Sequence, residues 1–143
     1  MLRGIRLIDA TRQGKADPPT GIRTLGLDGT HHWIVDLGPG TTTFRWPVDP
    51  ACLNLEGAVN CSWTVASADQ ALFFASNALC ALGESTWTIE PNLSAFENIT
   101  SGTIAGAAQV LGREGDTLLC RYDLTDYQGV LAASVDARIE IHR

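Results

Sequence analysis

The sequence predicts an all-β protein: an antiparallel β-sandwich of the immunoglobulin-like type with an extended N-terminal arm. Segments of about five to eight residues alternate between apolar and polar side chains, and turn residues recur roughly every 8–12 residues. The chain has 143 residues, which suits one main domain. We therefore expect an arm over residues 1–23 and a sandwich domain over residues 24–143.

The N-terminal segment differs in charge from the rest of the chain. Five cations face two carboxylates there, a net charge of +3, whereas the whole chain has −6 and its remaining 120 residues therefore −9. Pro18 and Pro19 disfavour a helix. We expect this arm to contact other proteins, or else to be a solvated tail. The expected interface residues are Arg3, Arg6, Arg12 and Arg23.

Several short segments before residue 91 have the composition of strands. Residues 31–37 and 41–46 are β-branched and aromatic and flank Gly38-Pro39-Gly40, which predicts a hairpin. Residues 60–66 alternate, with Cys61, Trp63 and Val65 on one face. Residues 85–90 place Trp87 and Ile89 on one face.

Residues 67–83 are ambiguous between helix and strand. Ser67, Asp69 and abundant alanine and leucine permit a helix that ends at Gly83. However, the apolar residues are nearly continuous and form no clean stripe with a period of 3.6. We therefore expect a strand followed by a loop.

The last third of the chain has the clearest alternation. It predicts a strand over residues 107–111, a turn over 112–116, and strands over 118–124 and 135–141. Each strand presents one apolar face. We expect a core between two sheets that contains Trp63, Trp87, Tyr122 and Ile139.

The four cysteines match no zinc or redox spacing. The first nine residues contain arginines where a signal peptide has its apolar region, so we expect a cytosolic protein with reduced thiols that mostly act as small buried hydrophobes. The alternative is a pair across two sheets, because Cys61 and Cys120 each lie two residues before an aromatic residue. The cysteines are Cys52, Cys61, Cys80 and Cys120.

No catalytic motif is present, so we expect no enzyme activity, no cofactor and no metal. His31 and His32 would point to opposite faces of a strand, and His142 is next to last. Carboxylate pairs near turns, Asp123 with Asp126 and Glu114 with Asp116, are better explained as solvated surface. A carbohydrate-binding module that stacks sugars on Trp33 and Trp46 is an alternative function of another class.

Residues 70–142 resemble the short immunoglobulin-like virion proteins of tailed bacteriophages, particularly fibre-to-tail adaptors. The resemblance rests on Ser85-Thr86-Trp87-Thr88-Ile89-Glu90-Pro91, Val110-Leu111-Gly112, Tyr122-Asp123-Leu124-Thr125 and the alternating strand that closes the chain. Unlike the adaptors, the chain has Gly112-Arg113-Glu114-Gly115 at the glycine turn and Gln128-Gly129-Val130 after the tyrosine strand.

The resemblance implies a structural protein of the virion that is assembled in the host cytoplasm as a homo-oligomer. Its expected partners are a portal, tail or fibre protein, or the major capsid protein if it is a capsid decoration protein instead. No nucleic acid and no membrane are expected as partners, since the acidic domain repels phosphate.

Overall fold

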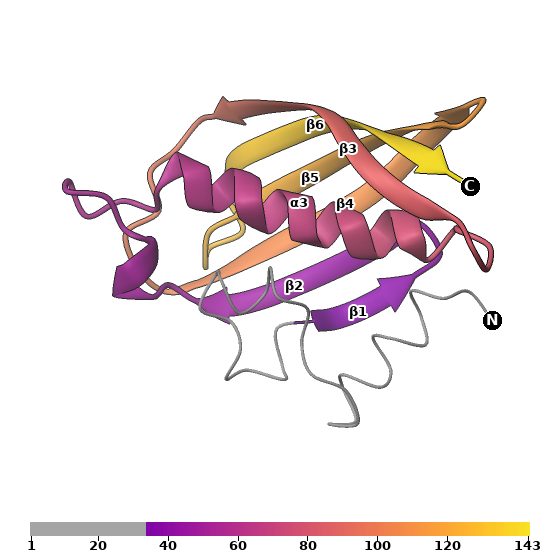
Figure 1. The fold of residues 1–143 in the computed structure, drawn as a ribbon. Helices are drawn as coiled ribbons and strands as arrows, with labels where there is room; N and C mark the ends of the chain where they lie inside the picture. The colour runs from indigo at the N-terminus through magenta and orange to yellow at the C-terminus, as the bar shows by residue number, and fades with distance from the viewer. Residues whose placement is uncertain (1–33) are drawn as a thin grey trace.

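The computed structural model describes residues 34–143 of the chain, which form one antiparallel sheet with one long helix packed on it (Figure 1). The sheet has six strands in the order β1-β2-β4-β5-β6-β3. The elements are β1 (Ile34–Gly38), β2 (Thr41–Pro47), the 3-10 helix η1 (Pro50–Cys52), α3 (Cys61–Asn77), β3 (Ser85–Ala95), β4 (Thr103–Glu114), β5 (Thr117–Thr125) and β6 (Leu131–His142).

The expected immunoglobulin-like sandwich is wrong. Within residues 34–143 a helix, not a second sheet, covers the apolar face of the strands. The predicted arm over residues 1–23 lies outside the described residues, and so does most of the stretch before β1. The start of a domain at residue 24 therefore stays a prediction.

The hairpin and the C-terminal strands are confirmed in place. β1 and β2 pair antiparallel across a turn at Gly40, whose φ of 76° favours glycine. β4 pairs with β5, and β5 with β6. β4 is longer than predicted and reaches Glu114, so the turn before β5 is confined to Gly115 and Asp116.

Helix α3 replaces the strand predicted over residues 60–66 and the strand and loop predicted over 67–83. Asn60 caps it, because its side-chain oxygen accepts a hydrogen bond from the Ser62 amide at 3.0 Å. The buried residues form a helical stripe of mostly small side chains: Trp63, Thr64, Ser67, Ala68, Ala71, Leu72, Phe74, Ala75, Ser76 and Asn77. Serine, threonine and alanine carry little hydrophobicity, so the stripe is hidden in the sequence.

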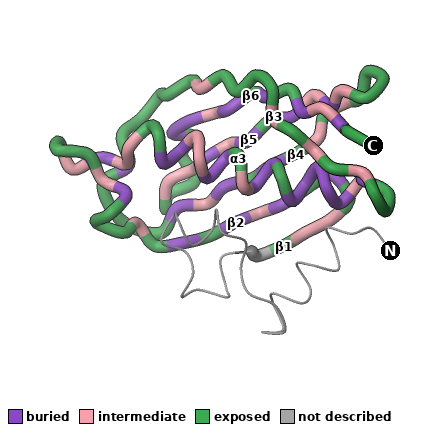
Figure 2. Tube along the Cα trace, in the orientation of Figure 1, coloured by how far each residue is buried: buried purple, intermediate pink, exposed green. Residues whose placement is uncertain are grey.

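The predicted core residues separate into two groups (Figure 2). Trp63, Tyr122 and Ile139 are buried where α3 meets the sheet, but Trp87 is 67% exposed. On β3 the side chains of Thr86 and Thr88 bond to α3, so Trp87 between them faces the other way, with its ring 5.8 Å from that of His142. The register assigned to residues 85–90 is therefore wrong by one face.

A buried hydroxyl pair joins α3 to the centre of the sheet. Ser67 Oγ lies 3.2 Å from Tyr122 Oη and 2.8 Å from the Thr64 carbonyl. Because Ser67 has one hydroxyl proton and donates it to that carbonyl, Tyr122 donates to Ser67. Complete burial raises the pKa of Tyr122, so the phenol keeps its proton at neutral pH.

Gly106 on β4 makes room for the ring of Tyr122. A Cβ atom at residue 106 would overlap the tyrosine hydroxyl and lie 2.6 Å from Cε2. We expect Gly106→Ala to lower the free energy of unfolding by about 1–3 kcal/mol, because a buried ring in a close-packed core has nowhere to move. Urea denaturation measures the change. Gly112→Ala on the same strand is the control, since a Cβ there meets nothing within 4 Å; equal losses in the two variants would contradict the explanation.

All four cysteines are free, and three are buried. Burial raises the pKa of the Cys120 thiol to about 11, and it also raises the pKa of Cys52 and of Cys80. Cys61 instead lies exposed at the first residue of α3. The alternative pairing of Cys61 with Cys120 is absent.

We expect one thiol of the four to react rapidly with an aromatic disulfide reagent in the native protein at pH 8. Cys61 is accessible, whereas the buried thiols are protonated and shielded. Cys61→Ser should remove the fast phase and Cys120→Ser should leave it intact. A fast phase that survives Cys61→Ser would show that a buried thiol is accessible.

Candidate functional site

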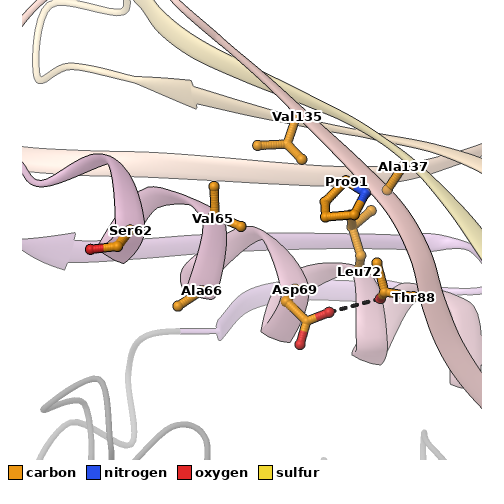
Figure 3. A pocket seen from close by; sticks show the side chains of 9 residues that line it. All are labelled: Ser62, Val65, Ala66, Asp69, Leu72, Thr88, Pro91, Val135 and Ala137. Atoms are coloured by element: carbon orange, nitrogen blue, oxygen red, sulfur yellow. Dashed lines mark hydrogen bonds between the residues drawn. The ribbon is translucent and has the colours of Figure 1, made fainter.

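A pocket of about 560 Å³ lies between the N-terminal part of α3 and the strands β3 and β6 (Figure 3). From the helix, its wall is formed by Ser62, Val65, Ala66, Asp69 and Leu72. From the sheet, it is formed by Thr88, Pro91, Val135 and Ala137. This volume falls in the range typical of small-molecule sites.

Asp69 is the one charged residue of α3, and it lies on the wall of this pocket. Its Oδ1 atom accepts a hydrogen bond of 2.7 Å from Thr88 Oγ1 on β3 (Figure 3). Within the described chain, its Oδ2 atom makes no hydrogen bond and can receive one from a bound molecule or water. The site thus combines an oriented carboxylate with a largely apolar pocket.

A β-bulge on β3 brings Thr88 and Pro91 to the same pocket. The pairing of β3 with β6 shifts register between Thr88 and Glu90. Residues 88 and 91 of a regular strand would point to opposite faces, but one extra residue turns Pro91 to the helix side. The bulge therefore builds the wall of the pocket beside the carboxylate.

Further polar contacts hold α3 along β3. Asn77 Nδ2 donates to Thr86 Oγ1 at 2.7 Å, and Ser76 Oγ donates to the same oxygen at 3.4 Å. A second hollow of about 290 Å³, on whose wall Phe73 and Trp87 lie, opens on the other side of the Asp69–Thr88 bond. These contacts fix the position of Asp69 relative to the strand.

The start of α3 forms the other polar end of the pocket. The amides of the first turn have no partners within a helix and carry a partial positive charge. The Asn60 side chain satisfies the Ser62 amide and also accepts from Ser62 Oγ at 2.6 Å. Asp69 lies eight residues after Cys61, which is about 12 Å along a helix.

The residues that the sequence analysis singled out do not gather here. Arg3, Arg6, Arg12 and Arg23 lie outside the described residues, as do His31, His32 and Trp33. Trp46 is buried with its ring centroid 5.2 Å from that of Trp63, so it offers no surface to a sugar.

The predicted carboxylate pairs serve turns and surface contacts. Asp126 accepts the amides of Gln128 and Val130 in a turn, and Asp116 pairs with Arg113 and Arg143. Asp123 accepts a hydrogen bond from Ser134.

The sequence analysis missed Asp69 because it interpreted the residue only as a capping side chain. The signal that could have found it is a single carboxylate in a run of 17 residues that otherwise has no charge. Within residues 34–143, no three potential metal ligands cluster, and no helix is long and apolar enough to cross a membrane.

No protein-family model and no curated protein sequence matches the chain. Solved structures do match. The PaaI protein of the Escherichia coli phenylacetic acid degradation operon has a TM-score of 0.79 at 16% identity, covering 98% of this chain and 94% of its own. A candidate thioesterase related to phenylacetic acid degradation, from Ralstonia eutropha JMP134, has 0.79 at 23%, covering 94% and 98%. A mutant thioesterase from Staphylococcus aureus has 0.73 at 15%, covering 77% and 92%.

These matches overturn the functional expectations drawn from the phage resemblance. The similar structures are hotdog-fold thioesterases and not virion proteins, so the adaptor, capsid-decoration and carbohydrate-binding functions, the phage partners and the virion location are all wrong. The expectation of no enzyme activity is contradicted too, because the similar structures are enzymes. The antiparallel sheet with one long helix packed on it is the hotdog fold.

Proposed function

We propose that this protein hydrolyses acyl thioesters at the pocket between α3 and β3, with Asp69 as the catalytic carboxylate. The observation that carries the proposal is the hydrogen bond of 2.7 Å between Asp69 and Thr88 on the wall of an apolar pocket. The similar hotdog structures described as thioesterases support this reaction class.

The chemistry needs few groups, because a thioester is already an activated acyl group. A water molecule attacks the carbonyl carbon while Asp69 accepts its proton. The carbon–sulfur bond then breaks, and the thiol leaves with a proton. Thr88 keeps the carboxylate oriented throughout by donating to Oδ1.

We expect Asp69→Asn to lower kcat/KM for acyl-coenzyme A probes by about 10²–10⁴-fold, because an amide cannot accept the proton. Thr88→Val should lower it by about 10–100-fold, the cost of losing a hydrogen bond to a charged group. Hydrolysis is followed by the ultraviolet absorbance of the thioester, which avoids the reactive Cys61.

Asp136→Asn is the matched control, since it makes the same change on the exposed face of β6. It should retain wild-type activity. Asp69→Asn can still bond to Thr88, so its stability to urea should stay close to wild type. An Asp69→Asn enzyme of normal activity would contradict the catalytic role.

One protomer does not complete the proposed site. The carbonyl oxygen gains negative charge during attack, and free amides at a helix start are suitable donors to it. Those of α3 lie about 12 Å from Asp69 along the helix, too far for both to reach one carbonyl group.

A second copy of the chain can supply the missing donors. β3 is an eleven-residue strand at the end of the described sheet, with one edge unpaired in residues 34–143. Antiparallel pairing of two β3 strands about a twofold axis continues the sheet. It also places the two α3 helices antiparallel on one face, so the start of each approaches the middle of the other.

Complementation tests this shared site. Cys61→Pro removes one free amide, and proline suits the first residue of a helix after Asn60, whose ψ of 135° is extended. We expect it to lower kcat by about 10²-fold. Cys61→Ala keeps the amide and should remain active.

Subunits of Cys61→Pro and Asp69→Asn, dissociated, mixed in equal amounts and reassembled, should regain about a quarter of wild-type activity, since half the dimers then contain one intact site of two. Light scattering should give twice the 15.3 kDa chain mass. A mixed dimer without recovery would place both groups in one protomer.

A further inference from the structure

We infer that the pocket selects acyl groups that are apolar and uncharged, that it rejects acyl groups ending in a carboxylate, and that Ala137 and Val135 on β6 set its depth. The inference rests on the proposed hydrolysis and adds its substrate class.

The walls beyond the carboxylate are apolar. Leu72 and Val135 are 1% exposed, and Ala137 is 5% exposed, so the end of the pocket belongs to the core. Val65 and Pro91 line the space between. An acyl chain that enters beside Asp69 therefore leaves water for hydrocarbon.

The polar groups of the pocket are already committed. Thr88 Oγ1 donates to Asp69, and Ser62 Oγ donates to Asn60. Neither hydroxyl has a second proton for another oxygen. A carboxylate carried in by the substrate would lose its water and find no donor among these side chains.

The charge in the pocket opposes an anionic acyl group. Asp69 is the one ionisable residue on the wall, and no cation lines it. A second carboxylate at this site would face both a like charge and an apolar surface. The selection therefore acts on the far end of the acyl group, where neutral and acidic substrates differ.

Small side chains on β6 leave the depth of the pocket open. Ala137 pairs with Pro91 of β3, and both line the pocket opposite the helix. A larger side chain at residue 137 would occupy the space beneath Asp69. Chain length should thus respond to residue 137 in one direction and to residue 135 in the other.

Hexanoyl-coenzyme A and adipoyl-coenzyme A test the charge selection, because they have acyl chains of equal length and differ in a terminal carboxylate. We expect kcat/KM to favour hexanoyl by about 100-fold or more. Ala66→Lys adds a cation at the half-exposed wall and should reduce this ratio at least ~10-fold, whereas Ala66→Met, of similar length, should not.

A series from butyryl- to dodecanoyl-coenzyme A tests the depth. Ala137→Leu should lower kcat/KM for octanoyl by about 10-fold or more while butyryl changes less than about 3-fold. Ala107→Leu, the same change on the exposed face of β4, should keep the wild-type profile. Val135→Ala should move the optimum toward longer chains, and it gives the answer if Ala137→Leu fails to fold.

The outcomes separate this inference from the proposed function. Hydrolysis of adipoyl equal to or faster than that of hexanoyl, or a length profile that neither β6 variant moves, would overturn the inference while the hydrolase stands. Failure to hydrolyse any thioester in the series would overturn the proposed function and this inference with it.

Discussion

The structure depends on how closely α3 can approach the sheet. Ala68, Ala71 and Ala75 are completely buried, and such small side chains let the helix lie directly on the strands. The strands meet this demand with Gly106, which leaves the ring of Tyr122 its place under Ser67. Larger residues on either side would lift the helix and open the core.

The pocket follows from the place where this close packing ends. Near the edge of the sheet, β3 contacts α3 through polar links from Thr86 and Thr88 rather than through apolar side chains. Between those links and β6 the small Ala137 leaves space unfilled. The carboxylate of Asp69 is held at the border of that space, which is the arrangement a preorganised catalytic group requires.

Alternation along the strands could be predicted from the sequence, but what covers their apolar face could not. Tyr122 and Ile139 alternate with polar neighbours because one face is buried, and a helix buries that face as well as a second sheet does. The same ambiguity produced the resemblance to immunoglobulin-like proteins. Residues 85–90 failed differently, since an edge strand that bonds to a helix through threonines leaves Trp87 outside.

Helix α3 and its carboxylate were hidden by one property of the segment. Cys61, Trp63 and Val65 alternate by chance, while the true period of the helix is marked by serine, threonine and alanine, which hydropathy hardly registers. Asp69 then looks like a cap in a loop. In a helix whose buried stripe is this small and whose surface carries no other charge, a carboxylate adds nothing to solubility that polar residues do not supply, and its bond to Thr88 directs it at the pocket.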